Sequence, residues 1–270
     1  SIRNFVVDKT QPLTNMEFLT HLNGKYWDEL PLNLQRLIEE TQVVIYKIMP
    51  GTPTDVKFNI FKRINTGGLV LEPQEIRHAL FQGKPALFIY DLAKTDEFLK
   101  ATDYKIATHR MLDRDFANRF LGFYLLGVEN YGTKEYGLDL DSFMSRAMAE
   151  IYSKTENELN KIKSDFSKAM ELSRLIFGRE AFRKVRGSYD RLPPINKALF
   201  DALATQLALL SNLDADKLYA NGKLFKDLLS KELATNSDFF MSVTSATGDK
   251  GKAILRHFKV KQLIKESINH

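Results

Sequence analysis

Helical periodicity in the second half of the chain is the feature that most constrains its fold. Apolar or small residues recur there at alternating three- and four-residue spacing, at Leu159, Ile162, Phe166, Ala169, Ser173 and Ile176. Residues three and four apart lie on one face of an α-helix, so the spacing predicts a helix with a continuous packing seam. Similar patterns predict helices over 109–127, 196–210 and 253–267. We therefore expect the second half to be almost wholly helical.

The first third of the chain has a more mixed pattern. A helix is predicted over 32–42, and the β-branched and aromatic run from 43 to 49 predicts a strand that ends before Pro50-Gly51. We expect an α+β fold, predominantly α, with a small mixed lobe followed by a helical lobe. The Gly- and Tyr-rich stretch 131–138 is the predicted joint between domains at 1–130 and 139–270.

Composition excludes several classes of protein. The chain has 270 residues and no cysteine, so disulfides, thiolate nucleophiles and cysteine-based metal sites are excluded. This is typical of the reducing cytoplasm, where we expect the protein to reside. The five histidines lack metal-ligand spacing, and we assign no metal-ligating residue. The longest apolar run, 121–128, is far shorter than a membrane span. A net charge of +5 permits contact with phosphate but does not require it.

The most specific motif lies between Phe58 and Gly83. A predicted helix containing Arg63 ends in Asn65, Thr66, Gly67 and Gly68, and a second helix begins at Pro73. Two glycines after a helix expose amide groups that can hold an anion, and an arginine offers a fork for phosphate. From this chemistry alone, a helix cap with a tight turn is favoured over a binding site. The helix–turn–helix spacing also gives the hypothesis that Gln74, Arg77 and His78 on the second helix recognise DNA. This signal is weak, because most helical hairpins bind no DNA.

The motif also resembles a known family. Phe61-x-Arg63-Ile64-Asn65-Thr66-Gly67-Gly68, followed by Leu71-x-x-Gln74-Glu75-Ile76-Arg77-x-Ala79-Leu80-x-x-Gly83, closely resembles the second conserved block of the family catalogued as Domain of Unknown Function 262. This domain stands at the N-terminus of GmrSD-type, modification-dependent restriction enzymes. Leu22-Asn23-Gly24-Lys25, Arg110-Met111 and Arg119-Phe120 resemble the same family, and the likeness covers residues 1–127.

The resemblance implies a ParB/sulfiredoxin-like lobe followed by helices, in a protein that hydrolyses nucleotides and binds or cleaves DNA in bacterial phage defence. The implied cofactor is a nucleoside triphosphate with Mg²⁺, and the implied partners are nucleotide and DNA. The family's first block, Asp-Gly-Gln-Gln-Arg, does not occur in this sequence. Ser1-Ile2-Arg3-Asn4-Phe5 is similar to the residues that follow that block. We therefore expect this chain to be part of a longer protein and inactive by itself.

Carried onto this sequence, the resemblance gives each motif residue a role. The catalytic candidates are Asn65, Arg63 and Glu75, and the nucleotide- or phosphate-binding candidates are Thr66, Gly67, Gly68, Gln74 and Arg77. For Glu75, an ion pair with Arg77 or a cap of its own helix is favoured over an acid–base role. The alternative for the whole chain is a helical scaffold without catalysis that binds DNA or another protein.

Two basic clusters are candidates for DNA contact. Their members are Arg179, Arg183, Lys184 and Arg186 in the first and Lys252, Arg256 and Lys259 in the second. Either cluster can follow a phosphate backbone or form a solvated helix face. The pairs Asp113/Asp115 and Asp139/Asp141 have a spacing that can hold Mg²⁺. Residues two apart on a helix point to different faces, so a helix-start or loop pair is the favoured interpretation in both cases.

Overall fold

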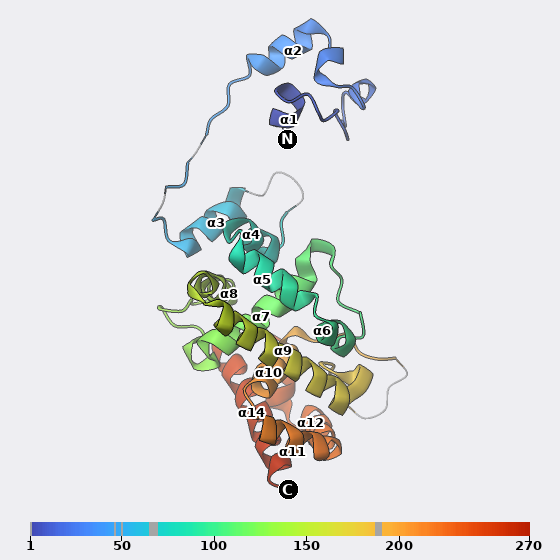
Figure 1. Cartoon of the computed structure of the whole chain (residues 1–270), viewed down its shortest axis with the longest axis vertical. Helices are drawn as coiled ribbons and strands as arrows, with labels where there is room; N and C mark the ends of the chain where they lie inside the picture. The colour runs from blue at the N-terminus through green and yellow to red at the C-terminus, as the bar shows by residue number, and fades with distance from the viewer. Residues whose placement is uncertain (1, 46, 50, 65–69, 187–190) are drawn as a thin grey trace. The chain divides into compact units, whose positions relative to one another are not determined.

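A computed structural model describes residues 2–45, 47–49, 51–64, 70–186 and 191–270. Contacts between residues divide the chain into two compact units, Ser1–Pro50 and Gly51–His270. Both units are built from helices (Figure 1). The described residues form no sheet and only two isolated β-bridges, Thr133–Gly137 and Arg183–Ile195. No described helix is long and apolar enough to cross a membrane.

The first unit is small and has its own apolar cluster. It contains the helices α1 (Ile2–Val6) and α2 (Leu32–Glu39) and the 3-10 turns η1 (Thr20–Leu22) and η2 (Trp27–Glu29). Phe5, Leu22, Trp27 and Leu30 form the cluster, in which the ring of Phe5 meets Trp27 edge to face at 5.6 Å. The Gln35 side chain donates to the carbonyls of Trp27 and Leu30, at 3.2 and 3.0 Å. These bonds tie α2 to η2.

The strand predicted over 43–49 is wrong for the described part of that stretch. Residues 43–45 and 47–49 have no regular secondary structure, and Val43, Val44 and Ile45 are exposed. A strand is stable only when another strand pairs with it. No second strand exists among the described residues, so β-propensity alone leaves this segment irregular. The predominantly helical class is confirmed, but the expected small mixed lobe is not found.

The second unit holds all remaining helices. Its α-helices are α3 (Thr54–Ile64), α4 (Pro73–Leu80), α5 (Lys84–Ala93), α6 (Asp96–Ala101), α7 (Leu112–Leu126), α8 (Leu140–Glu150), α9 (Glu156–Phe177), α10 (Lys197–Ala208), α11 (Asn212–Ala220), α12 (Gly222–Thr235), α13 (Ser237–Ser242) and α14 (Lys250–Ile268). The 3-10 turns are η3 (His109–Met111), η4 (Val128–Asn130), η5 (Ile151–Ser153) and η6 (Gly178–Glu180). The helices predicted over 159–176, 196–210 and 253–267 are confirmed. The helix predicted over 109–127 is found from Leu112 to Leu126, because Arg110 and Met111 before it have left-handed backbones. The stretch 131–138, predicted as an interdomain joint, lies inside this unit.

The helix α10 is the centre of the second unit. It packs against α7, α9 and α14 (Figure 1). Ten of its 12 residues are buried, as expected for a helix that other helices surround. The predicted seam on α9 is confirmed. Its members from Leu159 to Ser173 are all buried, and its last member, Ile176, is partly buried. A side-chain cap from Asn196 to the Leu199 N–H, at 2.8 Å, begins α10.

One buried carboxylate links three helices of this core. Asp201 on α10 accepts two hydrogen bonds from the guanidinium of Arg119 on α7, at 2.8 and 2.5 Å. The guanidinium of Arg256 on α14 lies 3.4 Å from the same carboxylate and donates to the Thr247 carbonyl at 2.8 Å. All three side chains are buried. The arrangement compensates charges that would be costly to bury singly.

We predict that Asp201→Asn destabilises the protein strongly. It keeps the size of the side chain but leaves two guanidinium groups buried without a countercharge, at a cost of about 3–5 kcal/mol. Urea unfolding should report this loss. The matched control is Asp96→Asn, which removes an exposed partner of Lys100 at 3.5 Å and should cost less than about 1 kcal/mol. Equal effects of the two substitutions would contradict the prediction.

Candidate functional site

The second half of the sequence motif forms α4 in the second unit. Pro73 occupies the first turn of α4, and the Glu75 carboxylate accepts the N–H of Glu72 at 2.7 Å, which closes a capping box. The same helix turn places Gln74 and Arg77 inward, at 2% and 1% exposure. Both side chains were singled out from the sequence, and both are polar groups inside the protein.

Arg77 is the hub of a polar network. Its Nε donates to the Gln74 side chain at 2.9 Å, and its two terminal nitrogens donate to Asp141 at 2.8 Å and Asp115 at 3.1 Å. The Gln74 oxygen also accepts from the Asn118 amide at 3.1 Å. The fixed fork of a guanidinium is suited to holding several acceptors in one geometry. Arg77 therefore fixes α4 against α7 and α8.

A pocket of about 410 Å³ opens beside this network. It is lined by Glu72, Pro73, Gln74, Arg77, His109, Arg110, Leu112, Asp115, Arg119, Leu140, Asp141, Met144 and Lys197. These residues come from α4, η3, α7, α8 and α10 and from the residue before α4, all within the second unit. Small-molecule sites in proteins have similar volumes and also combine apolar walls with a few converging polar groups.

Lys197 and Asp115 form the charged edge of the pocket. The Lys197 ammonium donates to Asp115 at 2.7 Å, and its side chain is 43% exposed. Burial alone would raise the pKa of Asp115, but the charges of Lys197, Arg119 and Arg77 lower it below its usual value. Asp115 is therefore ionised at neutral pH. An ammonium has three protons to donate, and Asp115 takes one of them.

The rim next to η3 holds a second ion pair in an unusual backbone. The Glu75 carboxylate accepts from the Arg110 guanidinium at 2.7 and 3.2 Å. This hydrogen bond is the main cause that lowers the pKa of Glu75. Arg110 and Met111 both have left-handed backbones, with φ of 55° and 58°. Non-glycine residues adopt this conformation at an energetic cost, and such residues are frequent at functional sites.

Glu75 has both structural roles that were favoured from the sequence, a helix cap and an ion pair, but the arginine in the ion pair is a different one. It caps its own helix as expected, but it pairs with Arg110 instead of Arg77. A carboxylate whose pKa is lowered and which already accepts these bonds is unsuited to donating a proton. The geometry therefore supports a positioning role for Glu75 at the rim.

The first half of the motif is described only in part. Arg63 lies in the last turn of α3 and is exposed, and it does not line the pocket. Asn65, Thr66, Gly67 and Gly68 lie outside the described residues. The roles expected for these four residues remain predictions.

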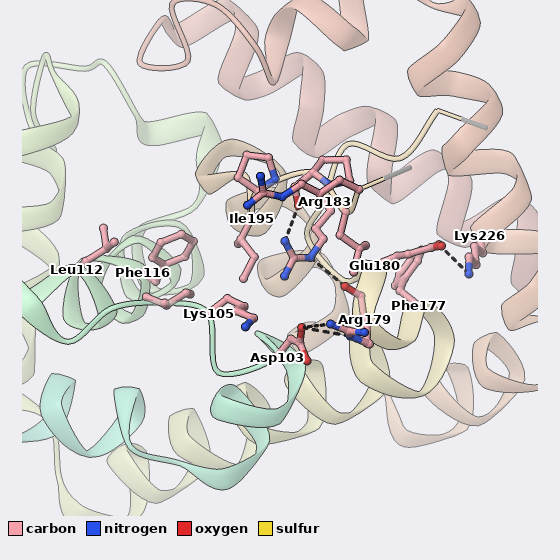
Figure 2. Close-up of a pocket in the computed structure, with 15 residues that line it drawn as sticks. Asp103, Lys105, Leu112, Phe116, Phe177, Arg179, Glu180, Arg183, Ile195 and Lys226 are labelled. Carbon is pink, nitrogen blue, oxygen red and sulfur yellow. Dashed lines mark hydrogen bonds and ion pairs between the residues drawn. The ribbon is translucent and has the colours of Figure 1, made fainter. Parts of the chain in front are cut away.

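The first basic cluster borders a separate open pocket of about 1330 Å³, shown in Figure 2. Arg179 reaches Asp103 at 3.2 Å, and Lys226 pairs with Glu180 at 2.8 Å. Arg183 is buried and donates to the carbonyls of Arg179 and Pro193, so it holds the loop in place. Lys105 and Arg191 line the same pocket and are exposed. Arg183 therefore has a structural role, while its neighbours face solvent.

The remaining members of this cluster lie beside Phe240. The Arg186 guanidinium stacks over the Phe240 ring at 3.9 Å, and the Lys184 ammonium lies 5.5 Å from the same ring. Arg186 also donates to the Ala234 carbonyl at 3.3 Å. Both cations remain partly or fully exposed. They extend the basic surface from the 179–186 segment towards α13.

The second basic cluster does not form an exposed cationic stripe. Arg256 is fully buried against Asp201, so its guanidinium cannot meet a phosphate backbone. Lys259 pairs with Glu232 at 3.2 Å, and Lys252 donates to the Ser245 carbonyl at 2.8 Å. All three residues lie on α14. Their charges, however, stabilise the contacts of α14.

Several residues of the pocket were not assigned to it from the sequence. Asp115 and Asp141 were noted only as members of separate D-x-D pairs, while Asp139 caps α8 by accepting the Ser142 N–H at 2.8 Å. Lys197 and Asn118 carry no sequence signal, since a polar residue in a helix is most often solvated. The two aspartates were recognisable as helix-start residues, but only the fold brings them to Arg77. The described residues contain no group of three His, Cys, Asp or Glu side chains that could hold a metal ion.

Comparison of the chain with protein-family models, with curated proteins and with solved structures found no match.

The Glu75–Arg110 pair predicts a pH-dependent stability. Because the pKa of Glu75 is lower in the folded than in the unfolded state, the stabilisation is present at neutral pH and is lost as the pH falls through the folded-state pKa. Glu75→Gln should therefore destabilise the protein at pH 7, and its difference from wild type should shrink below about pH 4.3. Denaturant unfolding between pH 3 and 7 measures this difference.

Glu72→Gln is the matched control, because Glu72 lies 4.0 Å from Arg110 and its side chain is 58% exposed. Its effect should be the smaller of the two. A Glu75→Gln effect that does not change with pH would contradict the prediction.

Proposed function

We propose that the pocket beside Arg77 binds the phosphates of a nucleotide, in a protein that hydrolyses nucleotides and acts on DNA in bacterial defence. The observation that carries this proposal is the convergence of residues distant in sequence. Gln74 and Arg77 come from the motif itself, and Arg110 and Arg119 come from the downstream part of the same resemblance. All four line one pocket.

The pocket offers donors suited to an anion. Lys197 and His109 lie on its lining and are exposed, and the Arg110 guanidinium at the rim is paired with Glu75. Charge-assisted hydrogen bonds of this kind are the strong contacts in phosphate recognition. Arg77 and Arg119 are bound to carboxylates, so they would hold the pocket in shape while Lys197 meets the ligand.

A nucleotide would bring Mg²⁺ with it, and Asp115 is poorly suited to bind that ion directly. One of its oxygens accepts from Arg77 and the other from Lys197. In nucleotide sites Mg²⁺ commonly keeps several waters and is bound by phosphate oxygens. We therefore assign Asp115 to the positioning of Lys197. Asn65 and the adjacent glycines remain the proposed contacts for the reacting phosphate.

Substitution of Lys197 tests the pocket. Lys197→Ala should weaken binding of ATP or GTP about tenfold or more, since a hydrogen bond to a charged group contributes about 1.5–3 kcal/mol. Isothermal titration calorimetry on this 270-residue chain measures the affinity, and it does not require hydrolysis.

Lys94→Ala is a closely matched control for that substitution. Lys94 also pairs with an aspartate in the first turn of α7, Asp113 at 3.4 Å, and its side chain is 36% exposed. It does not line the pocket. Its substitution should leave nucleotide affinity within a factor of about two. Equal losses in both variants, or no nucleotide binding by the wild type, would refute the assignment.

DNA binding is the second part of the proposed function, and the cations that line the pocket in Figure 2 support it. Exposed cations from three segments, Lys105, Arg179 and Arg191, border the same open pocket, and Lys184 and Arg186 extend it. Arg179 and Lys226 in this lining have acidic partners. Lys105 and Arg191 also line the pocket and are exposed. These cations, which lie at helix ends and in loops, would form ion pairs with the phosphates of a DNA backbone.

Charge reversal tests this surface. Lys105→Glu and Arg191→Glu should weaken binding of a DNA duplex. Each should also reduce the slope of log affinity against log salt, by about one for each DNA phosphate that the variant no longer neutralises. Fluorescence anisotropy between about 50 and 200 mM salt measures this slope.

Lys217→Glu on α11, exposed and outside the pocket, makes the same change of charge as Lys105→Glu and is its control. If that control weakens DNA binding equally, the effect is one of net charge and the assignment of this surface is refuted. If neither nucleotide nor DNA binds to the wild type, the alternative of a helical interaction scaffold is favoured.

A further inference from the structure

A third pocket lies where α7 ends. Its volume is about 600 Å³, and its walls come from the end of α7, η4, α10 and α14. Its apolar walls include Phe123 and the exposed ring of Phe258. This pocket shares no lining residue with the proposed nucleotide pocket.

Two buried side chains in the lining of this pocket have polar atoms without a partner. His257 is 1% exposed, and neither of its ring nitrogens has a hydrogen-bond partner in the described part of the protein. Thr205 is 2% exposed, and its hydroxyl is likewise unpartnered there. Buried polar groups are almost always hydrogen-bonded, so each exception calls for an explanation.

Two other buried hydroxyls on the helices of this unit show the usual solution, whereas the buried Ser145 hydroxyl, like that of Thr205, has no partner among the described residues. Thr102 donates to the Phe98 carbonyl at 2.7 Å, and Ser173 donates to the Ala169 carbonyl at 2.8 Å, each one helical turn back. Thr205 has a carbonyl one turn back as well, but its hydroxyl does not bond to it. Its hydrogen-bonding capacity therefore remains for a group outside the helix.

The protonation state of His257 limits what such a group can be. Burial, with the nearby charges of Arg256 and Arg119, holds the pKa of His257 well below its usual value. At neutral pH the imidazole is therefore uncharged and presents one N–H donor and one acceptor nitrogen. The ring also lies 4.7 Å from the ring of Phe123. A matching ligand carries both an acceptor and a donor.

The charges around the pocket disfavour an ionic ligand. Lys261 and Glu129 are the charged residues of the lining, and they offset each other. The guanidinium groups near His257 would also repel a cation. The exposed Phe258 ring gives a flat apolar surface against which a planar group can stack.

From these observations we infer that this pocket binds an uncharged, planar heteroaromatic ring with a donor and an acceptor on one edge, the chemical class of the nucleobases. The ring edge bonds His257 and Thr205, and its face stacks on the Phe258 ring. The Gln206 amide in the lining adds a donor and an acceptor. This inference does not depend on the proposed nucleotide pocket.

The direct experiment uses adenosine, guanosine, cytidine and uridine, which carry no phosphate, on protein labelled with ¹⁵N at histidine. At least one nucleoside should shift the His257 ring nitrogens, while those of His21, His78, His109 and His270 stay unchanged. Indole, which has a donor but no ring acceptor, should bind at least tenfold more weakly. No shift of His257 with any of the four nucleosides would overturn the inference.

Two substitutions then separate the site from general stability. Thr205→Val removes only the hydroxyl, and His257→Phe removes both ring nitrogens, so each should weaken nucleoside binding at least tenfold. Thr102→Val is the matched control, because that buried hydroxyl already has its partners, and it should leave binding unchanged. Lys197→Ala should leave nucleoside binding unchanged as well, which distinguishes failure here from failure of the phosphate pocket.

The melting temperature of the unliganded variants gives an independent readout. Removing an unsatisfied buried polar group is expected to stabilise a protein, so Thr205→Val should raise the melting temperature. Thr102→Val should lower it, since that substitution removes a hydroxyl that is already hydrogen-bonded. A lower melting temperature for Thr205→Val would show that an ordered water already satisfies the hydroxyl, and it would overturn the inference.

Discussion

The carboxylate of Asp201 is the group on which the arrangement of the second unit depends. It lies on the central helix α10 and binds guanidinium groups from α7 and α14. Apolar packing alone fixes helices loosely, because cores tolerate many apolar arrangements of similar volume. Bonds to two guanidinium groups permit far fewer positions. The orientation of α7 follows from these bonds, and α7 supplies Asp115 and Asn118 to the proposed nucleotide pocket and its polar network.

The polar core and the pocket beside Arg77 form one electrostatic system. Arg119 is paired with Asp201, but its charge also acts on Asp115, which holds Lys197. A change at α10 can therefore reach the rim of the pocket through ionic contacts alone. Buried ionic groups contribute little net stability compared with apolar ones. Their presence here agrees with a role in fixing the position of Lys197 and Arg77.

Sequence reasoning identified several of the helices and one side of the pocket. Periodicity was sufficient for α7, α9, α10 and α14, because each buries a face large enough to leave a pattern. Residue propensity failed over 43–45 and 47–49, since the described residues contain no second strand to pair with that segment. Gln74 and Arg77 were identified through the motif, whereas Lys197 reaches the pocket only through long-range packing. The basic residues of α14 were misleading, because a charge pattern does not distinguish Arg256, which is buried, from an exposed arginine.

The enclosure of α10 has a consequence for how the protein opens. A helix whose neighbours cover nearly every side can break its hydrogen bonds only when those neighbours separate. Its amide protons should therefore exchange with solvent at the rate of global unfolding. The first unit, with its small apolar cluster of Phe5, Leu22, Trp27 and Leu30, has much less to protect it. In amide exchange the two units should differ, with the first exchanging through local opening long before α10 does.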